Sequence, residues 1–157
     1  MKLYLMQHGK ALPKEKDPQK GLSPEGREQI ELSAKALKRL GLSFDVIASS
    51  PKKRAKQTAE IVAKECEYEG EVIINSVFEP LAPPEEAISF LKGLKKENIF
   101  VAGHLPSLGE IASRLLSETE VLIQFQMGGI CHILLENDKG KLIFLLTPEQ
   151  LKLLSQG

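Results

Sequence analysis

Three residues of this 157-residue chain have side chains and neighbours suited to chemistry on an anion. His8 and His104 each follow a short apolar run and stand beside a glycine, and Arg54 lies shortly after another apolar run. An imidazole can act as a nucleophile, and an arginine presents a fork of N–H donors that matches the oxygens of a phosphate. His132 lies in the middle of an apolar segment, where a structural role is expected. The pattern therefore favours transfer of a phosphoryl group to one of the first two histidines.

A metal centre is the less favoured interpretation of the same histidines. Metal sites in proteins need three or four ligands at suitable geometry. Neither His8 nor His104 has a second histidine or a carboxylate beside it at a typical ligand spacing. We therefore expect no metal and no cofactor.

The apolar runs predict the strands that must position these residues. A short continuous apolar run bounded by polar residues or glycine is typical of a buried strand, and four such runs occur at 3–6, 44–49, 72–74 and 99–102. His8 and His104 then stand at the carboxyl ends of two strands, which is the edge where open α/β sheets bind ligands. Gly9 has no Cβ, so its backbone can turn sharply or approach a ligand closely. We expect both histidines to face one crevice.

Helices are predicted between these strands. Ser23 is a good N-cap and Pro24 suits the first helical position, and further helices are expected from Pro51, over 84–96 and after residue 107. The helix predicted from Pro51 carries four cations in its first turns, where they oppose the helix dipole. These cations are Lys52, Lys53, Arg54 and Lys56. Either a bound anion compensates their charge, or they form a solvated basic face.

The alternation of strands and helices predicts an α/β fold. It is expected to be a three-layer sandwich, a mostly parallel central sheet with helices on both faces. Residues 130–135 and 142–146 flank a glycine-containing loop and predict a C-terminal antiparallel hairpin, followed by a short helix from Pro148. The length predicts a single domain spanning 1–157.

Composition limits the partners. Lys and Arg together number 21 and Asp and Glu also number 21, so bulk attraction to nucleic acid or a membrane is not expected. We see no signal peptide and no apolar run near the ~20 residues of a membrane helix. The two cysteines form no CxxC pair, which favours free thiols and a cytoplasmic location.

The polar loop at 13–21 leaves the same sheet edge as His8 and is either a rim or lid of the site or a solvated surface loop.

Taken together, these pieces resemble the histidine phosphatase superfamily, which has the phosphoglycerate mutase-like fold. The chain is most similar to the small SixA-type phosphohistidine phosphatases, and the resemblance covers nearly its whole length. Each motif is weak alone, but their order in one short chain is specific; they are Leu5-Met6-Gln7-His8-Gly9, Leu22-Ser23-Pro24-Glu25-Gly26, Ser49-Ser50-Pro51 leading to Arg54-Ala55 and Gln57-Thr58-Ala59, and Gly103-His104-Leu105-Pro106.

The resemblance implies roles for the site residues. His8 would take the phosphoryl group and become a phosphohistidine, which water then hydrolyses. Arg54 and His104 would bind the phosphoryl oxygens, helped by backbone N–H groups near Gly9 and Leu105. Larger members protonate the leaving group with an acidic residue, for which Glu79 is the positional candidate; a surface glutamate beside prolines also needs no such role.

One position departs from the family pattern. The family has an arginine before its nucleophilic histidine, and this chain has Gln7. Glutamine supplies an NH2 donor but no charge, and losing a charged donor from a phosphoryl site can cost ~10³ in rate. Either Lys10, Lys52 or Lys53 restores the charge, or the protein is a weak enzyme.

The function expected from this resemblance is a metal-independent phosphatase acting on phosphohistidine in a signalling protein, through a phosphohistidine intermediate. Its partner would be a phosphorylated protein of the histidine phosphotransfer type, with no nucleic acid and no membrane. Two alternatives remain open: a phosphomonoesterase for a small phosphorylated molecule, and a phosphate-binding regulator with little turnover.

Overall fold

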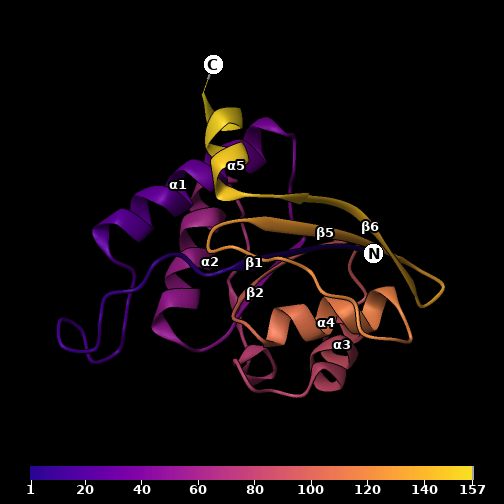
Figure 1. The fold of residues 1–157 in the computed structure, drawn as a ribbon. Helices are drawn as coiled ribbons and strands as arrows, with labels where there is room; N and C mark the ends of the chain where they lie inside the picture. Colours follow the sequence, from indigo (N-terminus) through magenta and orange to yellow (C-terminus); the bar gives the residue numbers. More distant parts are fainter. Residues whose placement is uncertain (157) are drawn as a thin grey trace.

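The computed structural model describes residues 1–156, which contain one mixed β-sheet with helices on both faces (Figure 1). The strands are β1 (Lys2–Gln7), β2 (Val46–Ser49), β3 (Ile73–Ile74), β4 (Asn98–Gly103), β5 (Ile130–Glu136) and β6 (Lys139–Leu146). The helices are α1 (Pro24–Arg39), α2 (Lys53–Glu65), α3 (Pro84–Gly93), α4 (Ser107–Leu116) and α5 (Pro148–Ser155), with a 3₁₀ turn η1 (Ser76–Phe78). The predicted α/β class and three-layer arrangement are confirmed.

The order of the strands is β3-β2-β4-β1-β5-β6. The first four pair in parallel and the last two pair antiparallel, so the predicted C-terminal hairpin is confirmed. Gln7 pairs with Gly103 in the β1–β4 register, so the residues after both strands leave the same edge of the sheet. This parallel pairing places His8 beside His104 although the two lie far apart in the sequence.

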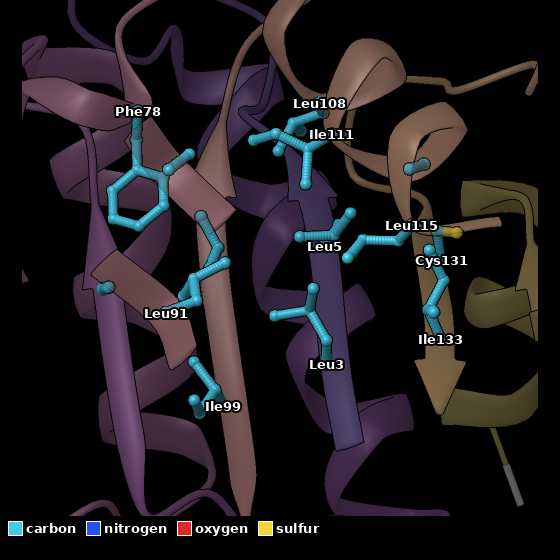
Figure 2. Close-up of a cluster of buried hydrophobic side chains, with 14 of the residues drawn as sticks. Leu3, Leu5, Phe78, Leu91, Ile99, Leu108, Ile111, Leu115, Cys131 and Ile133 are labelled. Carbon is cyan, nitrogen blue, oxygen red and sulfur yellow. The ribbon is translucent and has the colours of Figure 1, made fainter. Parts of the chain in front are cut away.

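The alternation of side chains along β1 divides the core into two layers. Leu3 and Leu5 belong to the layer covered by α3 and α4, where Figure 2 shows Leu5 next to Ile111 of α4 and Leu3 farther along the strand. Tyr4 and Met6 belong to the opposite layer, which is covered by α1, α2 and α5. The period of two fixes which face each residue covers, and burial of both faces explains the continuous apolar run of this strand.

Several predicted element ends differ from the structure by two or three residues. β2 begins at Val46 rather than at residue 44, and β6 begins at Lys139 rather than at residue 142. The Ser23 hydroxyl accepts from Gly26 N–H at 2.9 Å and caps α1, as predicted. The helix predicted from Pro51 begins instead at Lys53, because the Ser50 hydroxyl accepts from Lys52 N–H at 3.1 Å and holds the preceding backbone in a turn. The helix predicted over 84–96 ends at Gly93.

Two glycines let the chain after β1 lie directly against α1. A Cβ on Gly26 would stand 2.1 Å from the carbonyl oxygen of Lys10, and a Cβ on Gly9 would stand 2.7 Å from Cγ1 of Ile30. Gly9 is needed for this close packing, and its φ is not positive. The backbone beside His8 is thereby pressed onto a rigid helix.

None of the helices within residues 1–156 is both long and apolar enough to cross a membrane.

Candidate active site

The structure brings His8, Arg54 and His104 together at the carboxyl edge of the sheet. His8 follows β1, His104 follows β4, and Arg54 lies in the first turn of α2. The two imidazole centroids are 5.1 Å apart, and Nε of Arg54 lies 3.3 Å from Nε2 of His8. Two strand ends and one helix start therefore place two imidazoles and a guanidinium around one point.

The hydrogen bonds of His8 select its tautomer. Nδ1 lies 2.7 Å from the carbonyl oxygen of Gly9, which can only accept, so Nδ1 carries the proton. Nε2 is left with its lone pair toward the guanidinium of Arg54. Burial lowers the pKa of His8 below its usual 6.5; the Gly9 hydrogen bond opposes this, and the charges of Arg54 and Lys20 add to it. His8 is thus a neutral imidazole at pH 7. Its Nε2 lone pair accepts from Arg54 Nε–H here and becomes available for attack when phosphoryl oxygens take that hydrogen bond.

His104 is almost completely buried, with 2% of its surface exposed. Its Nε2 lies 2.8 Å from the Ser50 hydroxyl, which already accepts from Lys52 N–H. If Ser50 donates its own proton to Nε2, both groups are satisfied and the imidazole proton resides on Nδ1. Within residues 1–156, Nδ1 of His104 is buried and has no hydrogen-bond partner. A buried donor without a partner is the kind of group that a bound oxyanion satisfies.

Burial is the largest cause that lowers the pKa of His104, which falls to about 3, and the neighbouring His8, Arg54 and Lys52 lower it further. His104 is therefore neutral at pH 7 in the unliganded site. A neutral imidazole still donates one hydrogen bond from Nδ1. A bound dianion would favour the protonated form and raise this pKa.

The Thr58 side chain joins the backbone at Gly9, just after β1, to the helix that carries Arg54, through two hydrogen bonds. Its buried hydroxyl accepts from Gly9 N–H at 3.1 Å and donates to the carbonyl oxygen of Arg54 at 2.8 Å. Sequence reasoning did not give Thr58 a role of its own. The signal was present, because Thr58 lies four positions after Arg54 and so shares its face of α2.

Of the lysines considered as replacements for a missing arginine, two are engaged elsewhere. Lys10 pairs with Glu25 at 3.0 Å, and Lys53 pairs with Asp17 at 2.9 Å. Lys20 was not considered, yet its charge is one of the causes that lower the pKa of His8. Lys20 lies within the polar loop at 13–21, which leaves the same sheet edge as His8, and this position was the signal available in the sequence.

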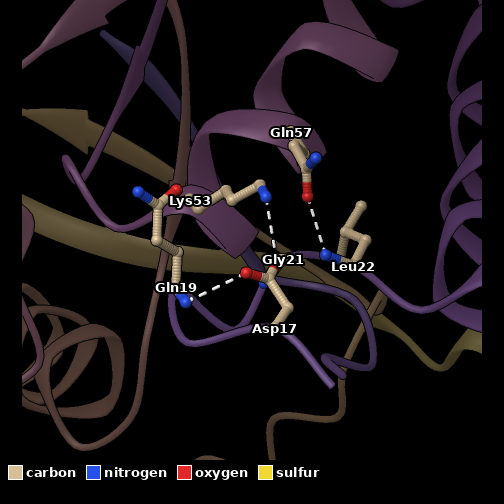
Figure 3. A network of polar contacts seen from close by, with 6 residues as sticks. All are labelled: Asp17, Gln19, Gly21, Leu22, Lys53 and Gln57. Atoms are coloured by element: carbon tan, nitrogen blue, oxygen red, sulfur yellow. Dashed lines mark hydrogen bonds and ion pairs between the residues drawn. The ribbon is translucent and has the colours of Figure 1, made fainter. Parts of the chain in front are cut away.

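The loop at 13–21 is fixed to α2 by polar contacts (Figure 3). Asp17 accepts from Lys53 Nζ and from the backbone N–H groups of Gly21 and Gln19, which lower its pKa to about 2. Gln57 accepts from Leu22 N–H at 2.7 Å. These contacts make the loop an anchored rim beside the site.

The remaining predicted site residues are not joined to this cluster by their side chains. The carbonyl oxygen of Gln7 accepts from Gly128 N–H at 2.9 Å. Leu105 is 41% exposed and begins a groove of about 710 Å³ along α4. Glu79 directly follows η1, and its side chain makes no hydrogen bond or ion pair within residues 1–156. The role of Glu79 as an acid stays a prediction.

Two other observations bear on the expectations for histidines and metals. His132 stacks on Tyr4 with centroids 4.2 Å apart and an interplanar angle of 19°, in the core layer away from the site, as a structural histidine would. Among residues 1–156, no three His, Cys, Asp or Glu side chains are grouped so as to hold a metal ion.

Comparison with known proteins places this geometry in a family. The model of the histidine phosphatase superfamily (branch 1) matches residues 3–76, which include the His8 strand and the Arg54 helix. The structure of the protein histidine phosphatase SixA complexed with tungstate superposes with a TM-score of 0.89, covering 97% of this chain and 100% of that chain. The chain belongs to the histidine phosphatase superfamily. It is a phosphatase of that superfamily, as the resemblance predicted.

Similar proteins are found by sequence and by fold. An uncharacterized protein of Picosynechococcus sp. is 35% identical over 125 residues, 73% of each chain. The mitochondrial serine/threonine-protein phosphatase Pgam5 of Drosophila yakuba is 35% identical over 77 residues, which are 48% of this chain and only 27% of that protein. At 24% identity, SixA shares the fold, and so does a phosphoserine phosphatase of Entamoeba histolytica, with a TM-score of 0.75, 18% identity and coverage of 95% and 98% of the two chains.

Proposed function

We propose that this chain is a metal-independent phosphatase that removes the phosphoryl group from a phosphohistidine of a signalling protein, in the cytoplasm. The observation that carries the proposal is the tautomer of His8. Nδ1–H is held by the Gly9 carbonyl, and Nε2 is directed at the guanidinium of Arg54, where phosphoryl oxygens would bind.

In the proposed first step, Nε2 of His8 attacks the phosphorus atom. A new N–P bond forms as the N–P bond of the substrate breaks, and the substrate imidazole leaves with its electron pair and gains a proton from solvent water. In the second step water attacks the phosphohistidine: an O–P bond forms, the Nε2–P bond breaks, and its electron pair returns to Nε2 of His8. The proton of the attacking water passes to solvent, and inorganic phosphate departs. Arg54 would stabilise the charge on the equatorial oxygens in both steps, and the unpartnered Nδ1–H of His104 would donate to one of them.

Two features support phosphohistidine as the substrate. An imidazole leaving group needs less help from an acid than an alkoxide does, and the Glu79 side chain makes no hydrogen bond or ion pair with the cluster within residues 1–156. The likeness to the protein histidine phosphatase SixA extends over 97% of this chain and 100% of that chain, with a TM-score of 0.89.

The decisive experiment measures phosphate release from a phosphohistidine-bearing protein at neutral pH, for the wild type beside His8→Ala. We expect turnover in the wild type, none above background in the variant, and no effect of EDTA. A transient acid-labile phosphate on the wild-type chain, trapped by rapid quenching, would support the covalent intermediate. Absence of turnover in a folded wild type that still binds phosphate would favour the regulator.

A second candidate is a phosphomonoesterase for a small molecule. It is kept because the fold is shared with a phosphoserine phosphatase. A substrate panel distinguishes the two: kcat/KM for phosphoserine and sugar phosphates above that for phosphohistidine would contradict the proposal.

A further inference from the structure

A groove of about 740 Å³ lies between the loop residues 18–20 and the first two turns of α2. The charged groups along it are Lys20, Lys52, Lys53, Arg54, Lys56 and Glu60. We call it the basic groove. The whole chain carries equal numbers of acidic and basic side chains, so this concentration of cations is a local property of one surface.

Most of this positive charge is not neutralised by the protein itself. Lys53 is paired with Asp17 at 2.9 Å. Within residues 1–156, Lys20, Lys52 and Lys56 form no ion pair, and all three are exposed. An anionic partner would therefore meet free ammonium groups rather than compete with existing carboxylates.

The start of α2 increases the positive potential. The helix has no acidic residue in its first turn, and its N-cap, Lys52, makes no side-chain capping bond. Cations at this end oppose the helix dipole and reduce stability unless an anion compensates. These cations lower the stability of the unliganded fold, as expected for a surface whose charges serve binding.

The basic groove is continuous with the candidate active site. Arg54 lines the groove, and its Nε also lies 3.3 Å from Nε2 of His8. Lys20 and Lys52 lie close enough to influence His8 and His104, respectively. A substrate whose phosphoryl group reaches His8 would thus extend its neighbouring groups over the lysines.

We propose that the basic groove binds acidic side chains that flank the phosphorylated residue of a protein substrate; this inference rests on the proposed function. The cations apart from Arg54 are lysines, which are mobile point charges without a fixed fork. They are spread over a loop and two helical turns, an arrangement that suits several carboxylates along a polypeptide better than one compact anion. Such charges mainly accelerate encounter and select partners.

The experiment compares two chemically phosphorylated histidine peptides that differ only in their flanking residues, acidic in one and neutral in the other. For the wild type we expect kcat/KM to be about tenfold higher for the acidic peptide at low salt, and the preference to shrink in high salt as screening shortens the range of the charges. In Lys52→Gln/Lys56→Gln the acidic-to-neutral ratio should fall close to one. Using this ratio cancels any effect of the substitutions on the chemical step.

Lys64→Gln is the matched control, because Lys64 is an exposed lysine near the other end of the same helix and does not line the groove. It should keep the wild-type ratio. The melting temperature of the double variant should be unchanged or higher, since unfavourable charges leave the start of α2. A wild type without a preference, or a double variant that keeps it, would overturn the inference while leaving the phosphatase proposal intact.

Failure to cleave either peptide would instead contradict the proposed function. The groove is then tested by fluorescence anisotropy with the unphosphorylated peptides. Tighter binding of the acidic peptide to the wild type than to the double variant supports the inference, and equal binding overturns it.

Discussion

Replacement of Thr58 by valine tests how the site holds its nucleophile. Valine has nearly the shape of threonine but no hydroxyl. The substitution removes the acceptor of Gly9 N–H and the donor to the Arg54 carbonyl, at 3.1 and 2.8 Å respectively. Both bonds lie next to groups that would touch the phosphoryl group, so we expect Thr58→Val to reduce both stability and catalysis.

The size of the effect follows from burial. Gly9 is buried, so its N–H would be left without a partner, at a cost of ~1–3 kcal/mol. The Arg54 carbonyl oxygen loses only its second donor, because this residue remains in α2 and its carbonyl keeps the helical hydrogen bond. A loss of ~2 kcal/mol corresponds to a fall of roughly 4–8 °C in melting temperature for a domain of this size. Displacement of the His8 backbone by up to ~1 Å would lower kcat/KM by roughly 10–100-fold.

The control is Thr58→Ser, which keeps both hydrogen bonds and deletes one buried methyl group at a cost of ~1 kcal/mol. Thermal unfolding and steady-state rates on a phosphohistidine peptide are measured for the three proteins. We expect the serine variant to keep kcat/KM within about threefold of the wild type, since its hydroxyl is in place. A valine variant with wild-type kcat/KM, or serine and valine variants with equal losses, would refute the positioning role of the hydroxyl.

Three further predictions concern packing, titration and the departure from the family pattern. Gly26→Ala should lower the melting temperature by roughly 4–8 °C, because its Cβ would overlap the Lys10 carbonyl and the overpacking of ~1–3 kcal/mol exceeds the gain in helix propensity; an unchanged value in calorimetry would show that the chain yields freely. Lys20→Gln should move the acid limb of the kcat/KM profile to higher pH, because removing a cation lets the lowered pKa of His8 rise; a limb that stays in place would contradict this influence. Gln7→Arg should raise kcat about tenfold or more by adding a charged donor, and no gain would show that other cations already supply the charge.

Sequence patterns predicted the scaffold well because its signals are local. The apolar run before His8 and the Ser23-Pro24 helix start depend on nearest neighbours and agree with the structure. The predicted start of α2 is two residues early because the Ser50 hydroxyl is hydrogen-bonded both to Lys52 N–H and to His104, which follows a different strand. A helix boundary set by such a distant partner leaves no mark in a local pattern.

For the candidate site, the sequence identified residue types and the structure decided which charges act. Lys10 and Lys53 were reasonable replacements for a missing arginine by position alone. The structure pairs them with Glu25 and Asp17, and leaves Lys20 near His8 instead. Ion pairing depends on which side chains come together across loops, and these long-range contacts cannot be predicted from the sequence alone.

The sequence by itself determined the fold class, the two strand-end histidines and the arginine at a helix start, because apolar periodicity and end signals are encoded in adjacent residues. Only the tertiary structure decided the tautomer of His8, the neutral state of buried His104 and the role of Thr58 between Gly9 and Arg54. These properties arise from hydrogen bonds and burial between segments far apart in the chain. Chain order and composition do not fix such contacts until the sheet register brings the segments together.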